Sequence, residues 1–196
     1  MMSREVLQIH GAKELINLIE TFDALPREAL DKFFNPYELH TLQTISDVTA
    51  YNYVFYDANE DIVMKYKGVS LSSVRTACFE TICAMANGKR FNVAKTLLQG
   101  FDYAFIIEGD ENIYQVMYFG SDGPEKLALY NTSIDSNCGY IPVFVFVNSG
   151  TEDLYRRNEK GEEYLIPNGE YYISKVSING RTGNAIVSKE EGKTCE

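Results

Sequence analysis

The 196-residue sequence contains no tryptophan and only two histidines, His10 and His40. A nucleophilic centre that relies on histidine as its general base therefore has few candidates. The phosphate-binding motifs GxGxxG and GxxxxGK[ST] are absent, as are HExxH, GxSxG and CxxC. No run of about 18 apolar residues occurs, so the sequence predicts no membrane-spanning helix. These absences leave chemistry that depends on carboxylates and on the backbone.

Cysteine is present, but not in a pattern that binds zinc. The four cysteines are scattered, and neither histidine lies near them in the sequence: Cys78, Cys83, Cys138 and Cys195. The N-terminus lacks the basic region and apolar core of a signal peptide. We therefore expect reduced thiols in a cytoplasmic protein.

The formal net charge is −10. A field of this sign repels phosphate backbones, which argues against general nucleic-acid binding, and it suits binding to a basic protein.

The order of the expected elements favours an α+β fold. Helices are predicted first, with apolar residues at helical spacing, and strands follow at hairpin spacing, with one turn at Asp57–Asn59 and another at Gly109-Asp110. The expected helices are 12–22, 26–34, 36–45, 72–90 and 91–99; the later strands include 127–133, 140–147 and 163–178. Ser70, Ser72 or Ser73 is expected to cap the fourth helix, and Gly88 to end it. Strands that follow one another in this way predict a mainly antiparallel core and not a doubly wound parallel sheet.

Three regions are expected along the chain. Residues 1–48 are predicted to form a helical segment packed on the core, residues 49–188 an α+β domain, and residues 189–196 a flexible tail.

The stretch GEEYLIPNGEYYI at 161–173 places two adjacent acids, Glu162 and Glu163, before an apolar strand and a turn. Such a pair is either a solvated strand end or part of a catalytic site. The longer stretch EKGEEYLIPNGEYYISKV resembles the last motif of the mono-ADP-ribosyltransferases of the bacterial-toxin and phage type, and it is most similar to the phage arginine-modifying enzymes. In that motif a catalytic Glu precedes an apolar segment, then Pro, any residue and Gly, matched here by Glu163, Pro167 and Gly169.

Two earlier motifs of that family also have counterparts, in the expected order. The first, often Tyr-Arg-Gly, contacts the dinucleotide, and this chain has Tyr66, Lys67 and Gly68 at that place. Lysine holds a phosphate as a point charge but lacks the bidentate fork of arginine.

The middle motif of the family, Ser-Thr-Ser, is matched by Asn131-Thr132-Ser133 after Tyr130. The resemblance implies that Tyr130 and Thr132 bind NAD with the Tyr66–Gly68 segment, and that Ser133 orients Glu163. The family also has Glu or Gln two residues before the catalytic Glu, where this chain has Gly161.

Glu162 is out of phase with that position because successive strand residues face opposite sides. A bulge at Gly161 would bring Glu159 or Glu162 to the acceptor. Glu162 is therefore kept beside Glu163 and Ser133 as a candidate catalytic residue.

The resemblance implies an NAD-dependent glycosyltransferase of a phage that modifies a host protein in the host cytoplasm, within a two-sheet core of the ADP-ribosyltransferase type. A carboxylate beside the ribose stabilises the positive charge that develops when nicotinamide leaves. The departures at Lys67, Asn131 and Gly161 leave NAD hydrolysis open. They also leave open a catalytically inactive acidic protein of the same fold that binds and inhibits a host factor. An α+β domain unrelated to this family is the third reading.

Overall fold

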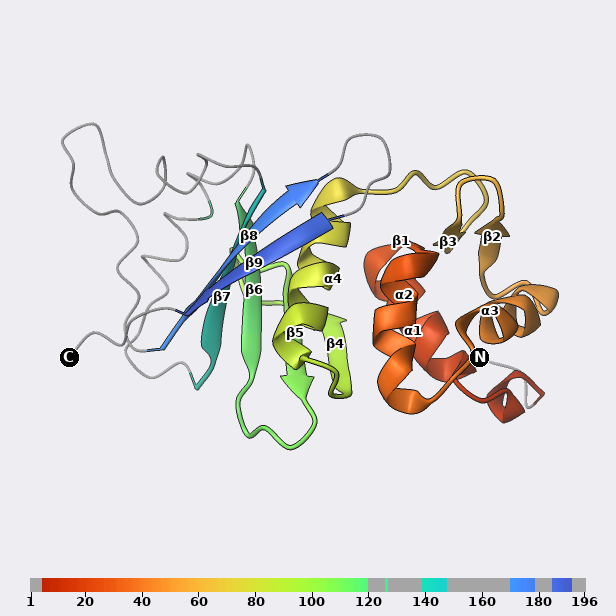
Figure 1. Cartoon of the computed structure of the whole chain (residues 1–196), viewed down its shortest axis with the longest axis horizontal. Helices are drawn as coiled ribbons and strands as arrows, with labels where there is room; N and C mark the ends of the chain where they lie inside the picture. Colours follow the sequence, from red (N-terminus) through yellow and green to blue (C-terminus); the bar gives the residue numbers. More distant parts are fainter. Residues whose placement is uncertain (1–4, 120–125, 127–138, 148–169, 179–184, 192–196) are drawn as a thin grey trace. The chain divides into compact units, whose positions relative to one another are not determined.

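Helices and strands together form a mixed α+β structure, which the computed structural model describes for residues 5–119, 126, 139–147, 170–178 and 185–191 (Figure 1). The chain divides into two units, residues 1–90 and residues 91–196. In Figure 1 the first unit runs from red to yellow-green and the second from green to blue. Within the described residues, no helix combines the length and apolar character that a membrane crossing requires.

The first unit contains four α-helices: α1 (Ala12–Phe22), α2 (Arg27–Phe34), α3 (Thr41–Ala50) and α4 (Ser73–Ala86). Two 3-10 turns, η1 (Val6–Gln8) and η2 (Asn35–Tyr37), accompany them. The prediction for α1 is confirmed, because its periodic apolar side chains are all buried on one face. The prediction for α2 is also confirmed, with Pro26 as the residue that precedes its first turn.

The predicted helix at 36–45 is wrong at both ends. Pro36 lies in η2, and Glu38 follows it in the left-handed conformation, with φ of 55°. A left-handed residue cannot continue a right-handed helix, so the chain leaves the helical path and starts again at Thr41.

A small antiparallel sheet completes the first unit. Its strands are β1 (Ala24–Pro26), β2 (Phe55–Asp57) and β3 (Ile62–Met64), in the order β1-β3-β2. The hairpin predicted around Asp57 is confirmed: Asp57 Oδ1 accepts hydrogen bonds from the backbone N–H groups of Asn59 at 2.9 Å and Glu60 at 3.3 Å. Strand β1 was not predicted, because a strand of only three residues that ends in a proline carries too little pattern to be recognised.

The last helix of the first unit, α4, packs on α1 and α2. Its cap is Ser72, whose hydroxyl oxygen accepts from the Arg75 N–H at 3.4 Å. Phe79 is fully buried and meets Phe22 edge to face, with ring centroids 5.1 Å apart. Lys32 on α2 donates to both carboxylate oxygens of the buried Glu80, at 2.9 and 2.7 Å. Residues 49–90 therefore group with the N-terminal helices, and the division between units falls after Arg90 and not at residue 48.

The second unit contains a six-stranded sheet in the order β4-β5-β6-β7-β8-β9. Its strands are β4 (Phe91–Lys95), β5 (Tyr103–Ile107), β6 (Tyr114–Phe119), β7 (Ile141–Val147), β8 (Tyr172–Ile178) and β9 (Ala185–Glu191). The predicted β5–β6 hairpin is confirmed. Because β9 extends to Glu191, residues 189–191 belong to a strand and not to the expected tail. Residues 127–133, where a further strand was expected, lie outside the described residues.

One prediction for this sheet is wrong. Residues 91–95 form a strand and not a helix: they pair with β5 from Phe91 opposite Ile107 to Lys95 opposite Tyr103. The pairings β6–β7 and β7–β8 are parallel, so the sheet is mixed. The other pairings of the described strands are antiparallel, in agreement with the predicted mainly antiparallel core. Strand β7 lies inside the sheet and is buried from Ile141 to Phe146, as expected for a strand covered on both faces.

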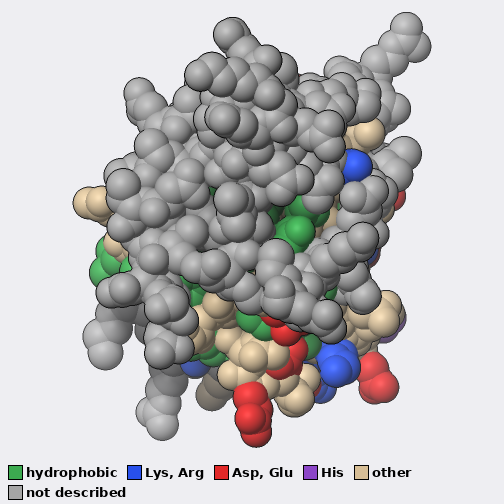
Figure 2. Space-filling view, turned by 90° about the vertical axis from the view of Figure 1, so that its left-hand side faces the viewer, with side chains coloured by type: hydrophobic (Ala, Val, Ile, Leu, Met, Phe, Trp, Pro, Cys, Tyr) green, Lys and Arg blue, Asp and Glu red, His purple; other side chains and the backbone are tan. Residues whose placement is uncertain are grey.

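Aromatic side chains dominate one face of this sheet. Phe119 and Phe146 stack with ring centroids 4.8 Å apart, within a buried cluster that includes Phe144 and Ile173. Figure 2 shows Asp and Glu side chains of the described residues near the lower edge of the face in view, beside Lys or Arg side chains.

Candidate functional site

A pocket of about 750 Å³ lies in the first unit. It is lined by residues 55–60 of the β2–β3 hairpin, by Met64 on β3, and by residues 67–70, which follow β3. Pockets of this size are typical of small-molecule sites in proteins. Two of the predicted NAD-binding residues, Lys67 and Gly68, are part of its lining.

Lys67 and Gly68 occupy the two central positions of a tight turn. The Val69 N–H donates to the Tyr66 carbonyl at 3.2 Å and closes the turn. Gly68 has φ of +87°, a positive value that type II turns require at their third residue and that glycine adopts readily. A Cβ at Gly68 would meet nothing within 4 Å, so the backbone there is open to a ligand. Glycine after the basic residue is therefore explained by the turn that presents Lys67.

Apolar side chains anchor this turn and give the pocket an apolar part. Val69 and Leu71 pack with Phe55 against a small core formed by Ala24, Ile62 and Met64. Three of these side chains, Phe55, Met64 and Val69, also line the pocket. A flat ring of a ligand can be buried against these apolar side chains. The charged residues lie on the two walls of the pocket, which are the hairpin at 55–60 and the segment 67–70.

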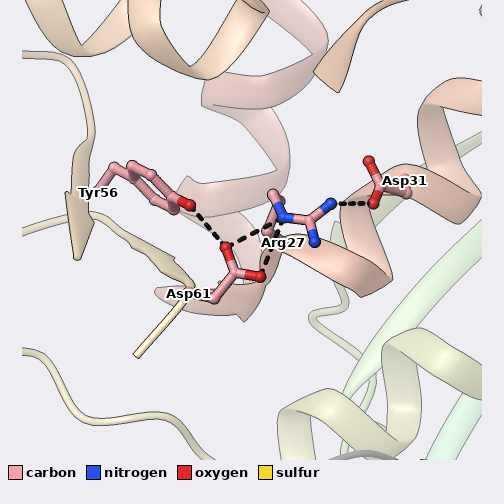
Figure 3. Close-up of polar contacts among 4 residues, drawn as sticks. All are labelled: Arg27, Asp31, Tyr56 and Asp61. Atoms are coloured by element: carbon pink, nitrogen blue, oxygen red, sulfur yellow. Dashed lines mark hydrogen bonds and ion pairs between the residues drawn. The ribbon is translucent and has the colours of Figure 1, made fainter. Parts of the chain in front are cut away.

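The hairpin wall of the pocket is fixed to α2 by a polar network (Figure 3). The Tyr56 hydroxyl donates to Asp61 Oδ1 at 2.6 Å, and Arg27 Nε donates to both oxygens of Asp61 at 3.0 Å. The Arg27 guanidinium also pairs with Asp31 on the same helix. In addition, the Arg27 backbone N–H donates to the Asp61 carbonyl at 2.9 Å. Asp61 therefore holds the Tyr56 side chain and the hairpin turn against the start of α2.

These contacts reinforce the ordinary protonation states of Tyr56 and Arg27. The hydrogen bond to Asp61 is the main cause that raises the pKa of Tyr56 above its ordinary value, and burial adds to it. The same carboxylate is the main cause that raises the pKa of Arg27. At neutral pH Tyr56 is therefore a neutral hydrogen-bond donor and Arg27 a cation, so the network is structural and not a source of nucleophile.

The charges that face the pocket are of both signs. Lys67 is exposed and forms no ion pair with any described residue, so its ammonium is available to an anion. Asp57 and Glu60 stand in the hairpin wall, and Ser70 adds a hydroxyl beside the turn. One cation, two carboxylates and an apolar part together suit a ligand with a phosphate, sugar hydroxyls and a flat ring. That combination is the chemistry of a nucleotide.

The structure brings only part of the predicted site together. Tyr66 is 62% exposed, lies outside the pocket lining, and has the Lys65 ammonium 5.4 Å from its ring centroid. The other candidates lie outside the described residues: Tyr130, Thr132, Ser133, Glu162 and Glu163. Asp57 and Glu60 were not predicted as site residues, because the sequence marked the hairpin tip only as a turn. The available signal was an acidic turn shortly before the Tyr-Lys-Gly segment.

Other reactive groups do not form a second centre in the part of the chain that the structure describes. No group of three His, Cys, Asp or Glu side chains there is placed to hold a metal ion. The two cysteines of the described residues, Cys78 and Cys83, form no disulfide. Burial, followed by the charge of Glu80, raises the pKa of Cys83 well above its ordinary value, so this thiol is not an activated nucleophile at neutral pH.

Comparison with known proteins gives no relative: no family model, no curated protein and no solved structure matches the chain.

Proposed function

We propose that this protein is an NAD-dependent mono-ADP-ribosyltransferase of the phage type, which transfers ADP-ribose to a host protein in the host cytoplasm. The observation that carries the proposal is the place of Lys67 and Gly68. The segment that matches the first family motif forms a glycine turn at the wall of a nucleotide-sized pocket. The glutamate motif at 163–169 and the Thr132-Ser133 pair supply the catalytic part of the proposal.

The strand that follows the glutamate motif supports the same assignment. The family motif continues into an alternating strand after its glycine, and here β8 begins at Tyr172, three residues after Gly169. Ile173 is buried in the sheet, and Tyr171 packs against the same cluster. Strand β8 lies between β7 and β9 and is held on both sides. Glu163 itself precedes β8 by nine residues and lies outside the described residues.

Each residue has a defined task in the proposed reaction. NAD supplies an ADP-ribosyl group whose bond to nicotinamide breaks as positive charge develops at the ribose. Lys67 would pair with a phosphate, and the open backbone at Gly68 would allow that phosphate to approach. Ser133 would hold the Glu163 carboxylate, which would bind the ribose 2′-hydroxyl and stabilise the developing charge. Glu162, or Glu159 through a bulge at Gly161, would engage the acceptor side chain.

A second candidate function is favoured by the replacement of arginine by Lys67. Lysine lacks the bidentate geometry with which arginine recognises a phosphate, so this site is a weaker phosphate clamp than the family motif. The sequence also departs from the family pattern at Asn131 and Gly161, and the net charge is −10. These features, with Lys67, suit an inactive member of the fold that binds a basic host protein.

The two functions are separated by incubation with labelled NAD and a bacterial lysate. We compare the wild-type protein with Glu163→Ala, and with Glu20→Ala as a control at an exposed acid of α1. Protein bands labelled by the wild type and the control, and absent with Glu163→Ala, are the expected result. Equal labelling by all three proteins contradicts the role of Glu163. Free ADP-ribose without labelled bands indicates hydrolysis, and no product from folded protein favours the inactive binder.

A further inference from the structure

We propose that Asp57 and Glu60 make the pocket selective for NAD over NADP. The inference rests on the proposed function, because it takes a nicotinamide dinucleotide as the ligand. It concerns two residues of the β2–β3 hairpin that carry no role in the proposed reaction. The extra phosphate of NADP is attached to the adenosine ribose, so the charge beside that ribose decides between the two ligands.

The two walls of the pocket differ in charge. The segment 67–70 contributes the Lys67 ammonium and the Ser70 hydroxyl, while the hairpin tip contributes the carboxylates of Asp57 and Glu60. Among the described residues, Lys67 forms no ion pair with either carboxylate. A ligand with one anionic part and one hydroxyl-bearing part therefore satisfies both walls when its phosphates lie toward Lys67 and a ribose lies toward the hairpin.

Asp57 is held in place before a ligand arrives. Its Oδ1 accepts from the N–H groups of Asn59 and Glu60, so the carboxylate is fixed over the hairpin turn. Both bonds are made by Oδ1, and Oδ2 is left to accept from a sugar hydroxyl. Tyr56, the residue before it, is bound to Asp61 through its hydroxyl, which fixes the same wall from the other side. In Rossmann-type NAD sites a carboxylate accepts a hydrogen bond from the adenosine ribose, and an arginine takes the 2′-phosphate in NADP sites; we assign the same chemistry to Asp57.

Among the described residues of the lining, Lys67 is the only cation that could meet a 2′-phosphate. That side chain is already needed by the phosphates common to both ligands, and the other charged residues among those described are acidic. A doubly charged phosphate about 6 Å from one carboxylate in water is disfavoured by about tenfold in affinity. We expect NADP to bind at least about tenfold more weakly than NAD at low ionic strength, where screening is small.

Calorimetric titration of the full chain with NAD and with NADP tests the inference directly. The variants are Asp57→Asn with Glu60→Gln, which keeps the oxygen that caps the turn, and Glu20→Gln as a control that removes a charge elsewhere. The double variant is expected to bring the two affinities within about threefold of each other, while the control keeps the wild-type ratio. Lys67→Ala is expected to weaken both ligands to the same degree. Thermal unfolding of each variant establishes that it is folded.

The outcomes distinguish this inference from the proposed function. Two results would contradict the proposed role of Asp57 and Glu60 in selectivity and leave the proposed function standing. One is equal affinity of the wild type for NAD and NADP, and the other is a double variant that keeps the wild-type ratio of the two affinities. If NAD binds and Lys67→Ala does not weaken it, the ligand lies elsewhere and the inference fails. If neither ligand binds to folded wild-type protein, both the inference and the proposed function fail.

Discussion

Asp61 offers the most direct test of how the pocket wall is built. We consider the substitution Asp61→Asn, which removes the charge and keeps the shape of the side chain. Asp61 has φ of 57°, and asparagine tolerates this left-handed conformation about as well as aspartate. The substitution therefore changes the hydrogen bonds to Tyr56 and Arg27 without adding backbone strain.

The expected loss of stability follows from the contacts that Asp61 makes. It accepts one hydrogen bond from the Tyr56 hydroxyl and two from Arg27 Nε, and its side chain is 43% exposed. A hydrogen bond to a charged group contributes about 1.5 to 3 kcal/mol when it is buried. Exposed ion pairs contribute less than about 1 kcal/mol, because water screens them. For a half-exposed carboxylate that serves two partners we expect a loss of about 1.5 kcal/mol, or about 4 °C in Tm for a chain of this size.

Thermal and urea unfolding of wild type, Asp61→Asn and Glu20→Gln measure this difference. The control removes one exposed acidic charge from α1 and is expected to change stability by less than about 0.5 kcal/mol. A double-mutant cycle with Tyr56→Phe is expected to show a coupling of about 1 kcal/mol between the two side chains. A loss no larger than that of the control, or no coupling in the cycle, would refute the view that Asp61 fixes the hairpin wall.

Three further predictions concern the rest of the described structure. Lys32→Met leaves the buried Glu80 without its partner and should cost about 2 kcal/mol by urea unfolding, whereas Lys13→Met at an exposed site of α1 should cost little. Phe79→Ala should cost about 3 to 5 kcal/mol in the same assay, because the ring is fully buried against Phe22. Burial first, and then the hydrogen bond to Asp110, raise the pKa of Tyr114 above its ordinary value near 10. Its contribution to stability is therefore complete below about pH 10 and is lost at higher pH, and Tyr114→Phe should flatten the alkaline fall in Tm.

The spacing of apolar residues and the turn residues predicted the elements for which both signals agree. In α1 the buried residues recur at helical spacing over the whole helix, and one face accounts for all of them. Strands β5 and β6 were predicted because two apolar runs flank a Gly109-Asp110 turn. In both cases the periodicity and the turn residues agree, so tertiary contacts only reinforce the local preference.

Local pattern failed where pairing with a distant segment decides the structure. Residues 91–99 contain alanine, lysine and two leucines, which favour a helix, and yet residues 91–95 form β4 because they pair along the length of β5. The parallel arrangement of β6, β7 and β8 depends on chain segments far apart in sequence. One signal for it was present: the continuous apolar run at 141–147 is typical of a strand buried on both faces, which is common in parallel sheets.

Sequence reasoning also found one wall of the candidate pocket and missed the other. Lys67 and Gly68 were proposed as binding residues because Tyr66-Lys67-Gly68 resembles the first motif of a known family, and both residues line the pocket. No sequence motif indicated the hairpin wall of the pocket. Asp57 and Glu60 line the pocket because of the position of the hairpin, which Asp61 and Arg27 fix to α2. Carboxylates at a hairpin tip are common, and only their position against Lys67 distinguishes these two.

Under the proposed function, binding and catalysis can be tested separately. The described residues of the pocket lining all belong to residues 55–70, within the first unit, and its two walls are held by the Tyr66–Val69 turn and by the Asp61 network. Glu163 belongs to the sequence of the second unit and lies outside the described residues. If NAD binds at this pocket, Glu163→Ala should lose labelling of the host protein and keep most of the affinity for NAD. Lys67→Ala should lose both, because a ligand that is not held at the phosphate does not reach the catalytic residue.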